Sequence, residues 1–328
     1  MADNKQKTKK QHFVPRLYLK RFADDRHKLF VFDKTLFKSF SADIADIAQE
    51  KFFYDIPESE ESQKLGMNVQ VVETALARIE RYLAPTFEAI LRRIESKHAK
   101  NIFRPEHRTY MSVFLALQAT RTKEFRTLMT ELAEKTLNAT LKPMIEENFP
   151  NVSSDTFEIK LKKEFKPLYH DGFIFNFEHQ RRFAAILHNH IWIVGANSTR
   201  QPFYVSDHPV VKWRHLPSPN TSLHTNMGIA SPGIEIAFPL SPKYILLLFD
   251  RFIFDEFKSK DGTLWKMTEE NVTYYNSLQV RQSYRQVYCL TNTFDLAKEM
   301  CQADPALNNP ERPRLDLLAF PPPLKPNK

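Results

Sequence analysis

The stretch "VQVVETALARIERYLAPTFEAILRRI", residues 69–94, sets the character of the N-terminal half of this chain. Its large apolar side chains recur at steps of three and four residues, which is the spacing of one face of an α-helix. The stretch therefore predicts a helix with one buried side, formed by Val72, Leu76, Ile79, Leu83, Phe87, Ile90 and Ile94. Glu73 and Glu80 are seven residues apart, so they lie two turns from each other on one line beside that side.

A second helical stretch follows in "RPEHRTYMSVFLALQATRTKEFRTLM", residues 104–129, with Pro105 suited to the first turn. One long helix is predicted, and a single arginine interrupts its apolar stripe of Tyr110, Phe114, Leu117, Arg121, Phe125, Leu128 and Leu132. A guanidinium is permanently charged, so a buried Arg121 requires a carboxylate or a phosphate-bearing ligand.

Arg121 therefore has two interpretations. The first is a scaffolding ion pair with Glu73 or Glu80, and it is favoured because structural ion pairs are common among such groups. The second is a clamp for a phosphate or carboxylate group at the floor of a pocket.

Nearer the N-terminus, "KKQHFVPRLYLKRFA", residues 9–23, mixes basic side chains with large apolar ones. Because a solvated arm does not carry six large apolar groups, residues 11–22 are expected to dock on the body of the protein. Docking would hold His12 and Arg16 against the core surface. A histidine beside a carboxylate can act as a general acid or base near neutrality. The competing interpretation is a histidine at the edge of the core, bonded to the backbone.

Polar residues also follow a strand in "VSDHPVV", residues 205–211. Ser206, Asp207 and His208 end a run of Val and Tyr, and Pro209 interrupts regular strand pairing. Strand ends beside such a break are places where sites are often built. An Asx-type turn, in which Asp207 bonds the local backbone, explains the same pattern equally well.

The remaining patterns predict an α+β fold. A hairpin is expected over residues 28–40, further strands in "WIVGAN", "IEIAFPLSP", "KYILLLFDRFIF" and "RQVYCLT", and a late helix capped by Thr268. The predicted arrangement is a helical N-terminal half packed on a mixed, mainly antiparallel sheet from the C-terminal half. Residues 11–300 are expected to form one domain, preceded by a basic flexible arm (1–10) and followed by a Pro-rich tail (301–328).

The amino-acid composition limits the cellular compartment and the kinds of partner that are expected. The chain has only six glycines in 328 residues, which disfavours the glycine-rich phosphate loops of nucleotide-binding folds. No apolar run is long enough to span a membrane, and two cysteines are too few for a disulfide framework, so a cytoplasmic protein is expected. Residues 1–28 hold nine Lys and Arg against three Asp, a net charge of +6 out of +8 for the whole chain. Such an arm would attract a polyanion such as a nucleic acid.

In combination, these motifs resemble the bacterial family catalogued as domain of unknown function 4238, over about residues 11–290. The opening HxVPxxYLxxF pattern is matched by His12, Val14, Pro15, Tyr18, Leu19 and Phe22. "FVFDK", "VETALARIE", "FLALQATRT", "VSDHP", "FPLSP" and "NSLQ" follow in the family's order, with His208 standing where members usually have Asn. The resemblance supplies no settled activity. It implies one recurring constellation of His12, Glu73, Glu80, Arg121, Ser206 and Asp207.

The first functional hypothesis is a phosphodiesterase or nuclease acting on nucleic acid. Its catalytic set is His12 as general acid/base, Arg121 on the phosphate, and Asp207 with Glu73 or Glu80, which orient His12 or hold a divalent cation. Gln11, Arg16 and Ser206 would contact the substrate. Carboxylates are hard oxygen ligands, so magnesium or manganese is the metal expected there.

The second hypothesis is a non-catalytic binding or sensor module that recognises an anionic ligand or a partner protein. In it the polar cluster is structural or ligand-holding, and the 216–233 loop and the Pro-rich tail are interaction surfaces.

Overall fold

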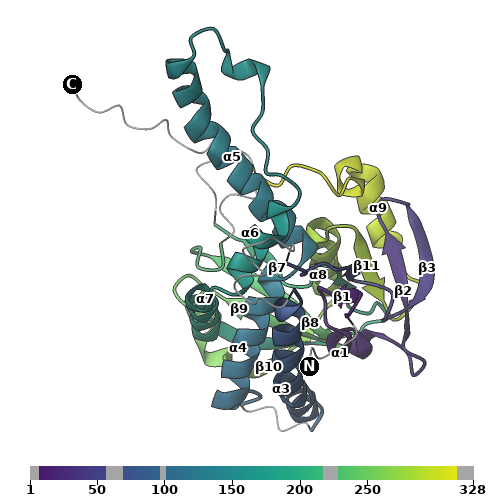
Figure 1. Cartoon of the computed structure of the whole chain (residues 1–328). Helices are drawn as coiled ribbons and strands as arrows, with labels where there is room; N and C mark the ends of the chain where they lie inside the picture. The colour runs from purple at the N-terminus through teal and green to yellow at the C-terminus, as the bar shows by residue number, and fades with distance from the viewer. Residues whose placement is uncertain (1–6, 57–68, 97–100, 217–227, 316–328) are drawn as a thin grey trace, which may run out of the picture.

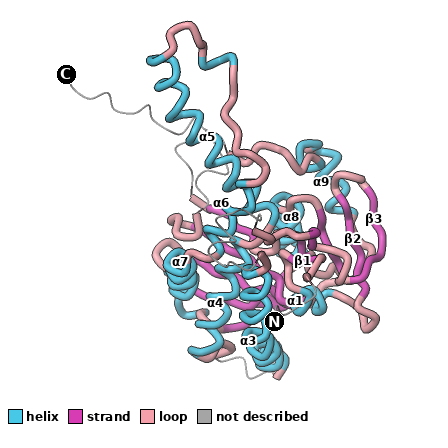
Figure 2. The backbone as a smooth tube through the Cα atoms, in the orientation of Figure 1, coloured by secondary structure: helices cyan, strands magenta, loops and turns pink. Residues whose placement is uncertain are grey.

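A five-stranded sheet lies at the centre of the computed structural model, which describes residues 7–56, 69–96, 101–216 and 228–315 (Figures 1 and 2). Its strand order is β10-β5-β9-β8-β7, and only the β10–β5 pair is parallel. These strands are β5 (Ile191–Asn197), β7 (Val211–Arg214), β8 (Ile234–Ser241), β9 (Tyr244–Phe249) and β10 (Thr263–Met267). The predicted α+β class is confirmed.

Two further sheets contain strands from the N-terminal half. The hairpin β2–β3 (Lys28–Asp33 and Lys38–Asp43) joins β11 (Gln286–Cys289) and β6 (Val205–Ser206) in the order β3-β2-β11-β6. A short antiparallel pair links β1 (Lys10–His12) to β4 (Gln49–Lys51). The arrangement therefore differs from the predicted single sheet. β11 is a buried strand whose backbone N–H and C=O groups need partners along both edges, and β2 of the hairpin supplies them on one side and β6 on the other.

The described α-helices are α1 (Arg16–Leu19), α3 (Val71–Glu95), α4 (Pro105–Thr120), α5 (Lys123–Asn148), α6 (Phe165–Ile174), α7 (Phe177–Asn189), α8 (Glu269–Gln282) and α9 (Asp295–Ala303). Helices α3, α4 and α7 cover one face of the five-stranded sheet, and α8 covers the other. The predicted Thr268 cap of α8 is confirmed, because its hydroxyl accepts the N–H of Asn271.

Alternation along the strands divides the core into two layers. Trp192 and Val194 of β5 pack in one cluster with α3, α4 and α7, whereas Ile191 and Ile193 pack in another with α8. Successive strand residues point to opposite faces, so each strand serves both layers. A third cluster joins the four-stranded sheet to α9.

The N-terminal segment docks into the first layer, as expected. Tyr18, Leu19 and Phe22 are fully buried. The Tyr18 ring stacks on Phe238 with centroids 4.7 Å apart, and its hydroxyl donates to the Pro239 carbonyl at 2.6 Å. A buried aromatic ring with a satisfied hydroxyl is a strong anchor, so this segment belongs to the core and not to a solvated leader.

The predicted single helix that begins in residues 104–129 is wrong, because the chain breaks at Arg121 and Thr122. Arg121 closes α4 as its C-cap, and Thr122 opens α5 as an N-cap whose hydroxyl accepts the Phe125 N–H at 3.3 Å. The Thr122 hydroxyl thus accepts the Phe125 N–H, which in a continuous helix would bond a backbone carbonyl one turn earlier. Tyr110, predicted on the buried stripe, is 49% exposed.

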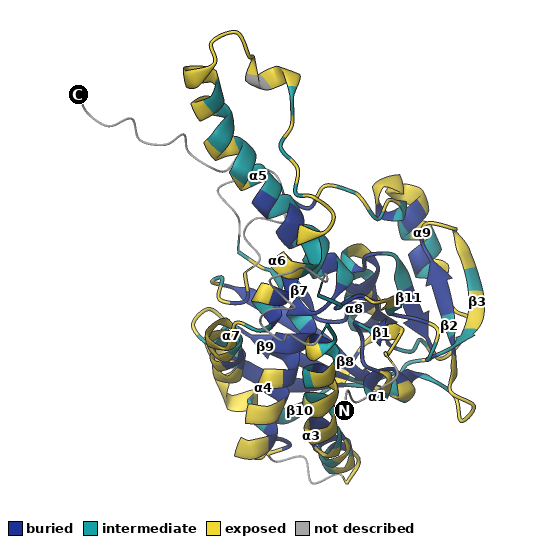
Figure 3. Cartoon of the chain, in the orientation of Figure 1, coloured by how far each residue is buried: buried dark blue, intermediate teal, exposed yellow. Residues whose placement is uncertain are grey.

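Helix α5 leaves the body about half-way along its length. Its buried residues all lie at or before Ala133, and Figures 1 and 3 show the rest projecting as an arm. The returning chain is held along this arm by Asn138, which bonds both the N–H and the carbonyl of Ile159. Only the first three turns of α5 can therefore contribute to a site in the body.

The chain after α9 returns to α5. A 3-10 turn, Pro305–Asn308, leads into residues 309–315, which we call the C-terminal strap. Glu131 of α5 accepts the backbone N–H groups of Arg314 at 2.8 Å and Leu315 at 3.0 Å. Residues 316–328 of the predicted tail, residues 1–6 of the predicted arm and residues 217–227 of the predicted loop lie outside the described residues.

Candidate functional site

Arg121 lies in a closed cluster of scaffold contacts. Its Nη1 donates to Glu80 Oε1 at 2.6 Å and its Nη2 to the His12 carbonyl at 2.7 Å. The Tyr54 hydroxyl lies 3.4 Å from Nε and donates to the Arg121 carbonyl at 2.7 Å. Burial opposes the charge, but Tyr54 and Glu80 outweigh it and raise the pKa of Arg121. The side chain is only 4% exposed, so the guanidinium is sealed by protein groups.

Gln11 and His12 belong to the same cluster. The Gln11 side chain accepts the Tyr54 N–H at 2.6 Å and donates to Asp55, so its amide holds the backbone. Burial lowers the pKa of His12 to about 4. An imidazole with that pKa is neutral at pH 7 and is a weaker base than an ordinary histidine. Arg16, the third candidate from this segment, is exposed.

Glu73 lies in the electrostatic range of this cluster, and its pKa is strongly shifted. Burial is the main cause, with Glu80 and Asp55 adding to it against Arg121, and together they raise the pKa of Glu73 from 4.5 to about 7. Perturbed carboxyl groups occur both in active sites and in structural clusters. The shift therefore has a consequence for stability whichever role Glu73 has.

Glu73→Gln is expected to stabilise the protein at pH 8 and to change little at pH 4. Because the folded-state pKa is raised, Glu73 contributes stability that is fully present below pH 4.5 and is lost as pH rises through about 7. Above that pH the native state carries a half-buried charge that glutamine removes, a gain on the order of 1–2 kcal/mol after solvent screening.

Urea unfolding at pH 4 and pH 8 measures this change. Glu88→Gln on the same helix is the matched control, since Glu88 is exposed and pairs with Arg21 at 2.8 Å. Equal effects of Glu73→Gln at both pH values would contradict the assignment of the raised pKa to Glu73.

Asp207 and Ser206 lie in a different cluster, at the end of β6. The Asp207 carboxylate accepts the backbone N–H groups of Tyr284, Arg285 and Gln286, each at 2.8 Å. Burial raises the pKa of Asp207 to about 6 although these bonds favour the ionised form. The Ser206 hydroxyl donates to Gln279 at 2.7 Å. Asp207 thus fastens the end of β6 to the segment that joins α8 to β11, and Ser206 fastens it to α8 itself.

The structure therefore brings together some of the predicted site residues and separates others. Arg121 bonds Glu80 and the backbone carbonyl of His12, whereas Asp207 bonds the backbone N–H groups of residues 284–286. The two clusters are linked through neighbours, because the Thr122 hydroxyl lies 2.7 Å from Nδ1 of His208. The residues predicted to be catalytic line neither of the two cavities described next.

Two cavities flank the C-terminal strap. The larger, which we call the outer cavity, has a volume of about 570 Å³ and lies where the first turns of α5 face the start of α6. It is lined by Glu50, Phe52, Phe53, Lys123, Arg126, Thr127, Thr130, Leu161, Lys163, Lys166, Pro167, Tyr284 and Glu311.

The smaller, which we call the inner cavity, has a volume of about 80 Å³ and lies on the other side of the strap. It is lined by Glu124, Leu128, His208, Lys212, Arg281, Gln282, Arg312, Pro313 and Arg314. The two cavities share no lining residue.

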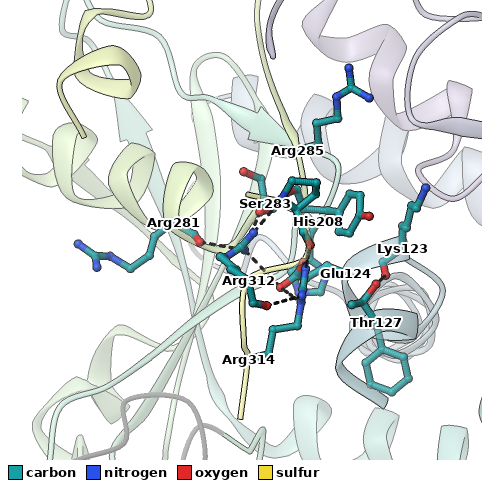
Figure 4. Close-up of polar contacts among 12 residues, drawn as sticks. Lys123, Glu124, Thr127, His208, Arg281, Ser283, Arg285, Arg312 and Arg314 are labelled. Atoms are coloured by element: carbon teal, nitrogen blue, oxygen red, sulfur yellow. Dashed lines mark hydrogen bonds and ion pairs between the residues drawn. The ribbon is translucent and has the colours of Figure 1, made fainter. Parts of the chain in front are cut away.

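The strap forms the wall between the two cavities, and ion pairs hold it against α5. Arg314 donates to both carboxylate oxygens of Glu124, at 2.9 and 2.8 Å, and Arg312 approaches the same group at 3.4 Å (Figure 4). Burial alone would raise the pKa of Glu124, but the two arginines outweigh it and lower it. Arg312 also donates to the Ser283 carbonyl at 2.9 Å, so it caps the C-terminal end of α8.

Sequence reasoning missed the basic residues of both cavities. Arg126 and Lys123 look like ordinary helix-surface residues, and Arg312 lies in a stretch interpreted as a tail. The one available signal was at "VSDHPVVK", where the strand end was identified as a candidate. There His208 and Lys212 line the inner cavity, whereas Ser206 and Asp207 are turned into the scaffold.

The described residues contain neither a group of possible metal ligands nor a helix that could span a membrane. Within residues 7–56, 69–96, 101–216 and 228–315, no three His, Cys, Asp or Glu side chains are grouped so that they could hold a metal ion. Among the same residues, no helix is both long and apolar enough to cross a membrane.

Comparison with known proteins gives one match. A family model described as "Protein of unknown function (DUF4238)" matches residues 10–293. Neither the curated proteins nor the solved structures contain a significant match to the chain. The matched segment includes the Arg121 cluster and the end of β6 and stops before the C-terminal strap.

Proposed function

We propose that this chain, which belongs to the DUF4238 family of proteins of unknown function, is a binding module whose outer cavity takes a phosphate-bearing ligand of nucleotide size. The ligand would be either a free nucleotide or one nucleotide of a single strand. The cavity volume of about 570 Å³ lies within the range usual for sites that bind small molecules.

Charge supports an anionic ligand. Four cationic side chains line the outer cavity against two carboxylates: Lys123, Arg126, Lys163 and Lys166 against Glu50 and Glu311. Glu50 is engaged by Lys123 at 2.6 Å, and Glu311 accepts the Tyr284 hydroxyl at 2.8 Å. An excess of positive charge on a concave surface attracts phosphate groups.

Arg126 is the observation that carries the proposal. Its guanidinium lies 3.6 Å from the centroid of the Phe53 ring, Nε donates to Nδ1 of His170 at 3.1 Å, and Nη2 donates to the Phe53 carbonyl at 2.7 Å. These contacts fix the plane of the group. No carboxylate among the described residues accepts a hydrogen bond from it, and Nη1 has no partner there, so an arginine on the cavity wall is oriented and not neutralised.

The neighbouring acid offsets this charge only in part. Burial raises the pKa of Asp171 to about 7, so at pH 7 its carboxyl group beside Arg126 is protonated in about half of the molecules. The Phe52 ring at the cavity wall adds a surface for a base, because Phe52 is 43% exposed. Stacking on aromatic side chains is how single-stranded nucleic acids are bound without sequence preference.

The phosphodiester hydrolase is the second candidate, and one observation favours it. The pKa of Glu73, about 7, is suited to a general base, and Glu73 lies in the electrostatic range of Arg121. In this proposal Glu73 replaces His12 as the proton acceptor, and Asp207 stabilises the fold.

Arg126→Gln is expected to weaken binding of a labelled single-stranded RNA or DNA oligonucleotide about tenfold or more, measured by fluorescence anisotropy at low salt. A charge-assisted hydrogen bond from Nη1 of Arg126 to phosphate contributes about this much to the affinity. Wild-type affinity should also fall as salt rises. Lys163→Gln, which removes an exposed cation of the same cavity, is expected to weaken binding several-fold without changing the melting temperature.

Arg182→Gln on α7 is the matched control, because Arg182 is exposed and, among the residues that the structure describes, pairs with Glu178 alone, at 3.0 Å. Unlabelled nucleoside monophosphates as competitors separate the free nucleotide from the strand. Equal affinities for wild type, Arg126→Gln and Lys163→Gln would refute the binding proposal. Cleavage by wild type with Mg²⁺ that is lost in Glu73→Gln but kept in Arg182→Gln would establish the hydrolase instead.

A further inference from the structure

We propose that the inner cavity is a second anion site, which takes a single phosphate or sulfate group and which the C-terminal strap completes. This goes beyond the nucleotide proposal, since the two cavities share no lining residue.

Charge in the inner cavity is left uncompensated. Glu124 is the one carboxylate in its wall, and Arg314 and Arg312 already occupy both of its oxygens. Lys212 and Arg281 then remain as cations for which the wall supplies no acid. Burial lowers the pKa of His208 to about 4, so this histidine is neutral at pH 7. The cavity thus has a net positive charge that a bound anion would balance.

Lys212 supplies the ammonium on which the positive charge of the inner cavity is centred. Throughout the described part of the chain its ammonium has neither a hydrogen bond nor an ion pair, although its backbone is fixed to Gln282 through two bonds, at 3.0 and 2.6 Å. Burial is the cause that lowers the pKa of Lys212 to about 8. A half-buried ammonium without an acceptor is unfavourable, and an oxyanion supplies the missing acceptor.

Size limits the ligand to one group. A volume of about 80 Å³ exceeds the 10–15 Å³ or so that one water requires and is far below that of a site for a whole nucleotide. A tetrahedral oxyanion has acceptor oxygens in several directions, which suits cations that come from β7, from the end of α8 and from the strap.

The strap supplies one wall of the site. Arg312, Pro313 and Arg314 form one wall of the cavity, and they lie beyond the segment that the family model matches, residues 10–293. Hydrogen bonds hold these strap residues in place. Arg312 donates to the Ser283 carbonyl at 2.9 Å, and Glu131 accepts the backbone N–H groups of Arg314 and Leu315.

Lys212→Gln in the full-length protein is expected to weaken binding of sulfate and of inorganic phosphate about tenfold or more, measured by calorimetry at constant ionic strength. Chloride and acetate are the reference anions and should bind neither protein measurably. Sulfate does not titrate near neutrality, so its affinity for wild type should fall as pH rises through about 8, where free Lys212 loses its proton. Lys212→Arg should retain most of the affinity.

Arg182→Gln on α7 is the matched control, because it removes an exposed arginine that lines neither cavity, and it should bind sulfate as wild type does. Arg281→Gln, which alters an exposed side chain, is expected to lose affinity several-fold with an unchanged melting temperature, so the test does not depend on Lys212→Gln folding. Sulfate affinity unchanged in both Lys212→Gln and Arg281→Gln would overturn the proposal. Failure of oligonucleotide binding alone would leave it standing, because that experiment reads the other cavity.

Discussion

Arg121→Met should lower the free energy of unfolding by about 3–5 kcal/mol, because breaking a buried ion pair leaves the partner charge without its counter-ion. Glu80 would lose a 2.6 Å bond while its own side chain is only 23% exposed, and the His12 carbonyl would lose its donor. Urea unfolding followed by tryptophan fluorescence measures the change. The result bears on function, since a residue that serves as a ligand clamp would affect affinity more than stability.

A paired variant isolates the ion pair. Arg121→Met combined with Glu80→Gln should recover part of the loss, since the uncompensated carboxylate is then absent, and the double-mutant cycle gives the coupling energy. Arg182→Met is the control for losing an arginine, because Arg182 is exposed, and it should change stability by about 0.5 kcal/mol or less. A loss below about 1 kcal/mol for Arg121→Met would contradict the scaffold role and return Arg121 to the candidate ligand-binding residues.

Asp207→Ala is expected to cost about 3–6 kcal/mol, the second large effect. Three backbone N–H groups, of Tyr284, Arg285 and Gln286, would lose their acceptor at once, and each unsatisfied buried donor costs about 1–3 kcal/mol. Thermal unfolding gives the loss of stability, and hydrogen exchange should show these three amides exchanging faster than those of β5.

Asp304→Ala is the matched control for this variant. The Asp304 side chain is exposed and accepts a single backbone N–H, that of Ala306 at 3.2 Å, so its loss should cost about 1 kcal/mol. Asp207→Asn keeps one acceptor oxygen and should fall between the two. If Asp207→Ala unfolded at the wild-type temperature but lost ligand binding or hydrolysis, Asp207 would be a site residue and not a fastener of β6.

The long helix α3 illustrates what periodicity can predict. Seven apolar residues at helical spacing placed the helix over residues 69–94, and it spans Val71–Glu95. The same reasoning failed at residues 121–122, because the helical spacing of apolar residues continues through the break into α5. A threonine N-cap and a threonine inside a helix look alike in sequence. Only the hydroxyl bond to the Phe125 N–H separates them.

The candidate site was predictable only in part. Arg121 was correctly identified as a charge that needed a partner, since a guanidinium on an apolar stripe is costly whatever the fold, and Glu80 was one of its two predicted partners. The cavities were not predictable. Arg126 owes its orientation to Phe53 and His170, and Glu124 owes its neutralisation to Arg312 and Arg314, which lie nearly two hundred residues later.

The amino-acid sequence by itself determined the elements of this protein: the amphipathic α3, the capped α8, the strand runs and the family that its ordered motifs indicate. These follow from local rules, because helix and strand periods and caps act over a few residues. Only the tertiary structure decided which polar side chains are bonded within the scaffold and which have no bonding partner among the described residues. That choice depends on whether a distant segment supplies a partner: residues 284–286 do so for Asp207, whereas none of the described residues does so for the ammonium of Lys212.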